Sequence, residues 1–217
     1  MRTKTFAAAA LLAAASLTLT ACGSGDDAGK PVAVVSEEAS SDKAATVLDK
    51  PFEKPDLVLT DTRGEKYDFR KETAGRPTLI YFGYTHCPDV CPTTMNNIAV
   101  AKKELPKAQQ DKLRVVFVTT DPDRDTPAEL GKWLKGIDPS FVGLTGDFAT
   151  VQAGARTLGI SIDPPRKDKN GKVVSEHGTQ VVAFSPKTDG GYVLYGEDAQ
   201  VEDYSADLPR IVEGKNP

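Results

Sequence analysis

The chain has no stripe of Lys and Arg with interleaved aromatic residues, and its formal net charge is −4. An acidic surface repels phosphate backbones, so a nucleic-acid partner is excluded. The apolar run from Phe6 to Ala15 is too short for a comfortable transmembrane helix. Cysteine is scarce as well, because the chain has three, at Cys22, Cys87 and Cys91. Few positions are therefore available for chemistry that depends on a thiol.

The N-terminus has the layout of an export signal. Arg2 and Lys4 precede the short apolar run, as in a secretory signal peptide. The stretch Leu19-Thr20-Ala21-Cys22 resembles the lipobox of bacterial lipoproteins, which implies cleavage before Cys22 and lipidation of that residue. We therefore expect a signal peptide over residues 1–21. The mature protein is expected to lie on the outer face of the cytoplasmic membrane, anchored by its lipid.

Residues 22–50 differ in composition from the rest of the chain. Gly, Ser, Asp, Ala and Lys dominate them, and they have few large apolar side chains with which to bury surface. We expect the lipidated cysteine and a flexible linker here. A single folded domain is expected over residues 51–217, which is a normal size for one core.

Apolar runs of strand length alternate with helical patterns along this domain. The order predicts an α/β fold with a mixed central sheet flanked by helices, an N-terminal hairpin, and an inserted hairpin or loop before His177. With a cysteine pair opening the first long helix, this is the thioredoxin-like plan. The expected strands are 57–59, 67–69, 78–84, 115–119, 141–144, 179–184 and 192–196, and the expected helices are about 88–105, 127–135, 148–158 and 208–212.

Cys87 and Cys91 lie at the predicted turn from a buried strand into that helix. Both sulfurs then share roughly one helix face, and the helix N-terminus lowers thiol pKa values, which favours redox chemistry or metal binding. Disulfide, zinc and copper all remain open on the cysteines alone. A set of two thiolates and the imidazole of His177 points first to copper, because a closed structural zinc site needs a fourth ligand.

Two features separate this pair from a thioredoxin-type disulfide enzyme. Such enzymes have two residues between the cysteines, whereas three, Pro88-Asp89-Val90, lie between them here. Thioredoxins also have a cis-proline before the strand that faces the cysteines, and the corresponding segment here is His177-Gly178-Thr179. A ligand stands where that proline would be.

The sequence resembles the Sco/SenC family of copper-binding assembly factors for the copper A centre of cytochrome c oxidase. The segments that carry the resemblance are Phe82 to Pro92, Thr120 to Pro127, and Glu176-His177-Gly178. The resemblance implies a thioredoxin-like domain that holds Cu(I), and also Cu(II), through Cys87, Cys91 and His177. The implied partners are the copper A subunit of the oxidase and an upstream copper donor. Two departures from the family pattern are Glu176, where Asp is more frequent, and a lipid tether in place of a transmembrane helix.

An alternative function needs no histidine. Cys87 and Cys91 would be the attacking and resolving thiols of a thiol–disulfide reductase that acts on the cysteines of the oxidase subunit. A metallochaperone, which carries copper and catalyses no reaction, is the leading hypothesis of the two. A structural disulfide is disfavoured, because a bridge across three residues restrains little chain entropy.

Four other residues receive secondary roles. His86 is expected to tune the neighbouring thiolate or to pack, since adjacency to Cys87 hinders binding of the same ion. Asp89 is either a weak Cu(II) ligand or a solvated carboxylate at the helix start. Arg124 is expected to pair with a carboxylate, and Met95 is assigned to the core by its helical spacing.

Overall fold

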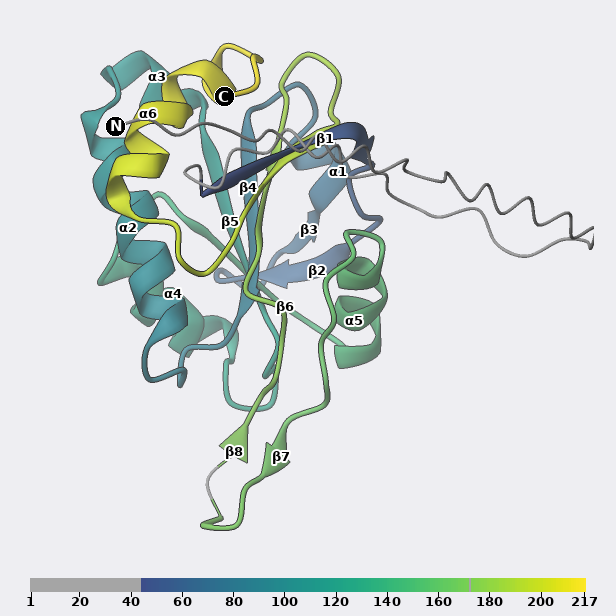
Figure 1. Cartoon of the computed structure of the whole chain (residues 1–217). Helices are drawn as coiled ribbons and strands as arrows, with labels where there is room; N and C mark the ends of the chain where they lie inside the picture. Colours follow the sequence, from purple (N-terminus) through teal and green to yellow (C-terminus); the bar gives the residue numbers. More distant parts are fainter. Residues whose placement is uncertain (1–43, 172) are drawn as a thin grey trace, which may run out of the picture. The chain divides into compact units, whose positions relative to one another are not determined.

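Residues 44–171 and 173–217 are described by a computed structural model, and they form a mixed sheet with helices on both of its faces (Figure 1). Within these residues the main sheet has eight strands in the order β1-β10-β9-β4-β5-β6-β2-β3. The β4–β5 and β5–β6 pairs are parallel and the other neighbours are antiparallel, as expected for a mixed sheet. The strands are β1 (Ala45–Phe52), β2 (Val58–Asp61), β3 (Lys66–Asp68), β4 (Thr78–Gly83), β5 (Arg114–Thr119), β6 (Val142–Thr145), β9 (Val181–Phe184) and β10 (Gly191–Tyr195).

The central strand β4 is buried along its whole length. Successive side chains of a strand point to opposite faces, so a continuous apolar run supplies two cores at once. Leu79 and Tyr81 lie in one core, and Ile80 and Phe82 lie in the other. This explains why the segment reads as an unbroken apolar run rather than as an alternation.

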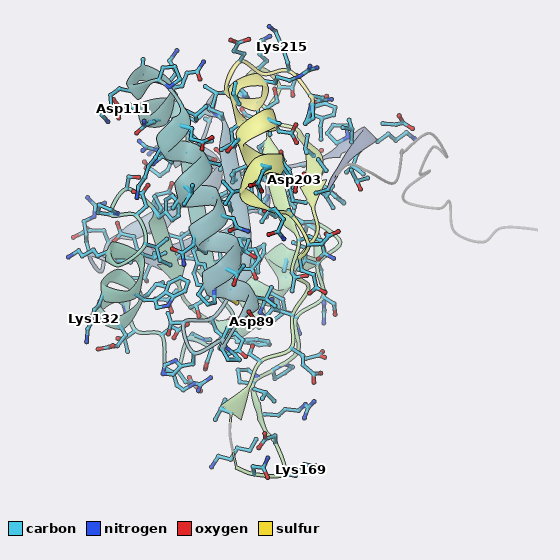
Figure 2. The ribbon with its side chains drawn as sticks, turned by 60° about the vertical axis from the view of Figure 1, so that its left-hand side comes forward. Asp89, Asp111, Lys132, Lys169, Asp203 and Lys215 are labelled. Carbon is cyan, nitrogen blue, oxygen red and sulfur yellow. The ribbon has the colours of Figure 1, made fainter. Side chains whose placement is uncertain are left out.

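The helices divide between the two faces. One core takes buried residues from α2, α4 and α6, and Figure 2 shows α6 lying alongside α2. The other core takes buried residues from α1 and α5, while α3 buries none. The helices are α1 (Phe69–Glu72), α2 (Val90–Glu104), α3 (Lys107–Lys112), α4 (Pro127–Lys135), α5 (Phe148–Arg156) and α6 (Val201–Val212).

Most predicted elements lie within a few residues of their predicted bounds, and the largest helical difference is α6. This helix begins at Val201, seven residues before the predicted start at Leu208. Pro209 lies inside it and interrupts the helical pattern of the sequence. Gln200 and Asp203 form a capping box that marks the true start.

The start of the folded domain corrects a prediction. We expected a linker up to residue 50, whereas β1 begins at Ala45 and pairs with β10 at the edge of the sheet. Most side chains of β1 are exposed, including Val47, which is 44% exposed. An edge strand held by backbone hydrogen bonds leaves little hydrophobic pattern in the sequence, and this is why composition suggested a linker.

The inserted hairpin before His177 is confirmed. It consists of β7 (Arg166–Lys167) and β8 (Val173–Val174), which form a separate two-stranded sheet. Between these strands and the domain, Ile162 and His177 form an isolated antiparallel bridge. The hairpin extends beyond the end of the main sheet in Figure 1, and Lys169 lies at its tip in Figure 2. His177 therefore lies where the hairpin rejoins the domain.

The expected signal peptide, the lipidated Cys22 and most of the linker lie outside the described residues. Among residues 44–171 and 173–217, no helix is both long and apolar enough to cross a membrane.

Candidate metal centre

The two thiols lie where β4 passes into α2, as predicted. Cys87 is on the connecting loop and is partly buried, whereas Cys91 is in the first turn of α2 and is fully buried. Both are free thiols, and the backbone N–H of Cys91 donates to the Cys87 sulfur over 3.5 Å. The loop and the first helical turn thus bring the sulfurs to the same end of the sheet.

Gly83 makes this approach possible. A Cβ at this position would lie 2.9 Å from the Cys91 sulfur and 2.7 Å from the Tyr81 ring. Any larger residue would force the sulfur away from the end of β4. The last residue of the buried strand therefore has to be glycine for Cys91 to pack where it does.

The two thiols have opposite acid–base character. The pKa of Cys87 is lowered to about 5, chiefly because its sulfur accepts a hydrogen bond from the Cys91 thiol, with help from backbone N–H groups and from His177. The pKa of Cys91 is raised, because its thiol donates that hydrogen bond and because it is buried. At neutral pH the pair holds one thiolate, on Cys87, and one thiol, on Cys91.

His177 contacts the buried sulfur. Its Nε2 atom lies 3.6 Å from Cys91 Sγ, and its Nδ1 atom lies 3.0 Å from the carbonyl oxygen of Gly178. A carbonyl oxygen can only accept, so Nδ1 donates to it, and in the neutral ring the lone pair is then on Nε2. The Nε2 atom, with this lone pair, faces the Cys91 sulfur.

Two tyrosine rings fix the orientation of the imidazole. Tyr81 and Tyr84 both meet the His177 ring edge to face, with centroid separations of 6.1 Å and 5.8 Å. Edge-to-face contacts of this kind favour one ring orientation. The imidazole is therefore held by two edge-to-face ring contacts as well as by the hydrogen bond from Nδ1 to the Gly178 carbonyl.

The 3.6 Å separation of Cys91 Sγ and His177 Nε2 is compatible with two ligands of one metal ion. Ligand bonds of about 2.3 Å to sulfur and about 2.0 Å to nitrogen place the two donor atoms 3.6 Å apart when the angle at the ion is about 110°. Within the described part of the chain, no three His, Cys, Asp or Glu side chains are already gathered closely enough to hold an ion. The ligand roles of Cys87, Cys91 and His177 stay a prediction, and their donor atoms suit Cu(I).

Tyr81 contacts the candidate site and was missed by the sequence analysis. It is buried in β4, and its hydroxyl donates to Cys91 Sγ over 3.6 Å. Burial raises the pKa of Tyr81, so the phenol stays protonated and remains a donor. A tyrosine in an otherwise aliphatic and aromatic buried strand was the available signal, because a buried hydroxyl needs a partner.

His86 and Asp89 stay apart from the Cys91–His177 contact. His86 is about half exposed, and its Nδ1 atom lies 3.5 Å from Asp125. Asp89 is exposed at the N-cap of α2, and its side chain makes no capping hydrogen bond. Met95 is fully buried, as its spacing predicted.

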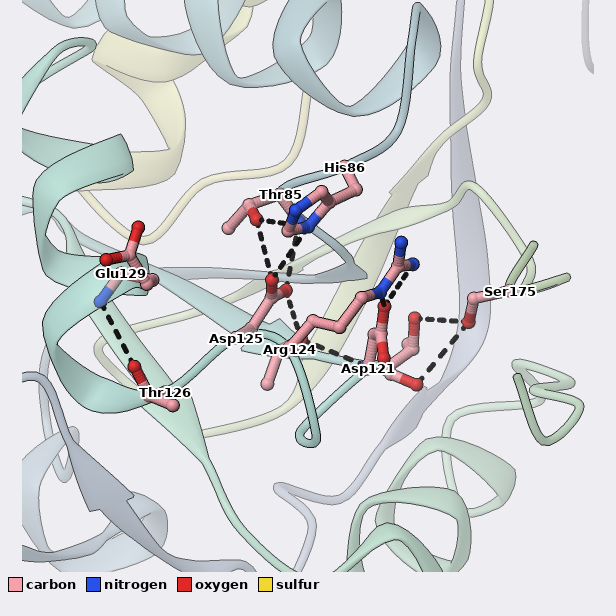
Figure 3. Close-up of polar contacts among 10 residues, drawn as sticks. Thr85, His86, Asp121, Arg124, Asp125, Thr126, Glu129 and Ser175 are labelled. Atoms are coloured by element: carbon pink, nitrogen blue, oxygen red, sulfur yellow. Dashed lines mark hydrogen bonds and ion pairs between the residues drawn. The ribbon is translucent and has the colours of Figure 1, made fainter. Parts of the chain in front are cut away.

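The loop between β5 and α4 contacts Thr85 and His86, which precede Cys87 (Figure 3). Asp125 is buried and accepts from the backbone N–H of Thr85 at 2.9 Å and from its hydroxyl at 2.6 Å. Arg124 pairs with Asp121, which confirms the expected use of Arg124. Thr126 ends this loop and caps α4 by accepting from the N–H of Glu129.

A dithiol at the start of the first long helix, with an imidazole opposite, defines a thioredoxin-like domain equipped for metal or redox chemistry. The sequence model of the SCO1/SenC family matches residues 43–213, and the chain belongs to this family.

Known proteins agree with this assignment. The mitochondrial SCO2 homolog of Bos taurus is 30% identical over 159 residues, which cover 71% of this chain and 58% of that protein. The copper-bound structure of ScoI from Bradyrhizobium japonicum is 33% identical, with a TM-score of 0.62, and the match covers 74% of this chain and 97% of that one. A second structure, BsSco, is described as a member of the Sco family of cytochrome c oxidase assembly proteins; it is 19% identical with a TM-score of 0.57 and shows the fold alone.

The chain spans between about half and two thirds of the length of the curated relatives it matches. Its relatives include copper-binding proteins, and copper is the metal found in the B. japonicum structure.

Proposed function

We propose that the chain is a membrane-tethered, extracytoplasmic copper metallochaperone that delivers copper to the copper A site of cytochrome c oxidase. The observation that carries the proposal is the 3.6 Å contact between Cys91 Sγ and the Nε2 atom of His177. It joins a soft sulfur donor to a correctly oriented imidazole, which is a donor set that suits copper. The relatives that bind copper support the same metal.

The placement of the donors suits transfer by ligand exchange. Cys91 lies in the first turn of α2 and Cys87 on the loop before it, while His177 lies at the base of a hairpin outside the main sheet. The hairpin can move without unfolding the domain, so the imidazole can leave the ion while the thiolates still hold it. A thiolate of the acceptor then takes the vacated position, and the copper passes without being released to water.

Copper binding and transfer by the purified, reduced protein test this proposal. We expect one Cu(I) per chain, and loss of that copper to a copper-free fragment of the oxidase subunit that carries the copper A cysteines. A His177→Ala variant should bind copper more weakly, whereas His86→Ala should match the parent protein. Absence of stoichiometric copper, or unchanged binding in His177→Ala, would contradict the proposal.

A second function is favoured by the unequal thiols. The Cys87 thiolate, with its pKa lowered to about 5, can attack a partner disulfide at neutral pH and form a mixed disulfide. Cys91 then loses its proton and attacks the Cys87 sulfur, which releases the partner as a dithiol. Two electrons pass to the partner, and a Cys87–Cys91 disulfide remains.

A metal-free His177→Ala variant separates the two functions. A reductase keeps its activity in this variant, so the oxidised acceptor fragment should be reduced at the parental rate. Failure to reduce the fragment, together with copper transfer by the parent protein, leaves the metallochaperone as the function.

The membrane tether is tested at Cys22. We expect the wild-type protein to take up a labelled fatty acid in the cell and to fractionate with membranes, and Cys22→Ser to do neither. A Cys22→Ser protein that stays in the membrane fraction would contradict a lipid anchor.

A further inference from the structure

The loop that joins β5 to α4 contacts both halves of the candidate site. On the cysteine side, the buried Asp125 carboxylate accepts from the N–H and hydroxyl of Thr85 and from the hydroxyl of Thr119 at 2.6 Å. Thr85 lies two residues before Cys87 in the chain. Asp125 therefore fastens the cysteine loop to the end of β5 (Figure 3).

On the histidine side, a hydroxyl pair makes the connection. The Oγ1 atom of Thr120 lies 2.8 Å from the Oγ atom of Ser175, and the Ser175 hydroxyl also donates to the Thr120 carbonyl over 3.4 Å. Because the single Ser175 hydroxyl proton goes to the carbonyl, the Thr120 hydroxyl donates to the Ser175 oxygen, and both hydroxyl protons are in hydrogen bonds. Both residues are buried, and Ser175 lies two residues before His177.

The hairpin itself supplies little to hold His177 in place. Its strands β7 and β8 have two residues each. At the base of the hairpin, two backbone hydrogen bonds join the segment that contains His177 to residues 161–163. Gly178 N–H donates to the Ser161 carbonyl, and Asp163 N–H donates to the Glu176 carbonyl. A ribbon of this size has marginal stability alone. The Thr120–Ser175 pair ties this ribbon to the end of the main sheet.

The anchoring point is itself well fixed. The backbone N–H of Thr120 donates to the Gly83 carbonyl over 2.7 Å, which joins the ends of β5 and β4. Gly83 is the residue against which the Cys91 sulfur packs. Buried contacts therefore connect the Cys91 sulfur to Gly83, Gly83 to Thr120, and Thr120 to the segment that carries His177.

We propose that Thr120 and Ser175 are positioning residues, whose buried hydroxyl pair holds the His177 ring in contact with the Cys91 sulfur, at 3.6 Å, and thereby sets copper affinity and copper release. The inference rests on the proposed copper-binding function. It also gives a role to the segment Thr120 to Pro127, which the sequence analysis singled out without assigning it to the site.

The test compares Thr120→Val with Thr120→Ser. Valine keeps the shape and removes the hydroxyl, whereas serine keeps the hydroxyl. We expect Thr120→Val to weaken copper binding about tenfold and to speed copper release by a similar factor, because one buried partner is lost. Thr120→Ser should stay close to the parent protein, and Ser175→Ala should reproduce the effect of Thr120→Val.

A double-mutant cycle with His177→Ala distinguishes positioning from general damage. If the hydroxyl pair acts through the imidazole, Thr120→Val should change copper affinity less than about twofold in the His177→Ala background. An equal tenfold loss in both backgrounds, or no loss in either, would overturn the inference. Urea unfolding of each variant identifies any that have lost the fold.

A metal-free measurement keeps the inference separate from the proposed function. In the copper-free protein, amide hydrogen exchange at Asp163 and Gly178, whose N–H groups hold the base of the hairpin together, should be about tenfold faster in Thr120→Val than in the parent. Unchanged exchange overturns the positioning role even if the parent protein binds copper. If the parent binds no copper, the proposed function fails, while the exchange measurement still decides whether Thr120 holds His177.

Discussion

The thiols and the imidazole reach the same site from parts of the molecule that differ in how firmly they are held. Cys91 belongs to a helix whose inner face is buried against the sheet and whose neighbour is α6. His177 belongs to the base of a ribbon that pairs two residues with two. One side of the site is therefore part of the core, and the other is attached by a few local contacts. This asymmetry is what a protein needs if it must hold an ion and also give it up.

The largest effect is expected from the core side. Cys91→Ser replaces the buried sulfur by a hydroxyl of similar size and removes a soft ligand. Copper affinity should fall by more than about 100-fold, which is a larger fall than removal of a residue that only supports a ligand would cause. Competition with a chelator of known affinity measures this change. A Cys91→Ser variant that retains tight copper would show that the buried sulfur is not a ligand.

A smaller and selective effect is expected from the ribbon side. His177→Ala should weaken Cu(II) binding about 100-fold and Cu(I) binding about tenfold, because imidazole contributes more to the harder ion and two thiolates can hold Cu(I). Titration in each oxidation state measures the difference. His86→Ala is the matched control, since its ring faces Asp125. Equal losses for both ions would contradict the division between a core side and a ribbon side.

The difference between the thiols gives a pH prediction. Only the thiolate reacts with iodoacetamide, and the pKa of Cys87 is lowered to about 5 from 9.0. In metal-free protein, alkylation of Cys87 should be almost constant between about pH 6 and 8 and fall about tenfold per unit below pH 5. Cys91, whose pKa is raised, should stay unmodified over this range. Mass spectrometry of each peptide measures both, and alkylation of Cys87 that starts only near pH 9 would contradict the arrangement.

The smallest effect is expected from the tyrosine that donates to the buried sulfur. Tyr81→Phe should cost about 1 kcal/mol in the free energy of unfolding and shift copper binding a few-fold toward Cu(II), because a hydrogen bond to the sulfur favours Cu(I). Tyr195→Phe removes another buried hydroxyl, which donates to Asp207 of α6 over 3.1 Å. This control should lose comparable stability and leave copper binding unchanged. Equal copper shifts in both variants would refute a specific role for Tyr81.

The sequence was sufficient for the parts of the site that depend on local order. A buried strand that ends beside Cys87, followed by a helix with Cys91 in its first turn, follows from hydrophobic pattern and turn residues. The contact with His177 was expected from the family resemblance, since 86 residues separate it from Cys91. Local patterns carry no information about such a distant pairing.

The supporting residues could not be predicted in the same way. Tyr81 reads as one more apolar residue of a buried strand, and Ser175 reads as a polar residue of a loop. Their roles depend on which hydroxyl meets which atom across the fold. The edge strand β1 was missed for a related reason, because backbone pairing holds it and its side chains show no hydrophobic alternation.

On the proposed copper-carrying function, the short ribbon next to His177 has a kinetic consequence. Because the imidazole leaves when a few local hydrogen bonds open, the lifetime of the closed site is set by a local opening event and not by unfolding of the domain. Such events occur many orders of magnitude more often than global unfolding. A protein of this kind can thus be thermodynamically stable and still exchange copper quickly, because the opening rate of one small ribbon sets the exchange rate.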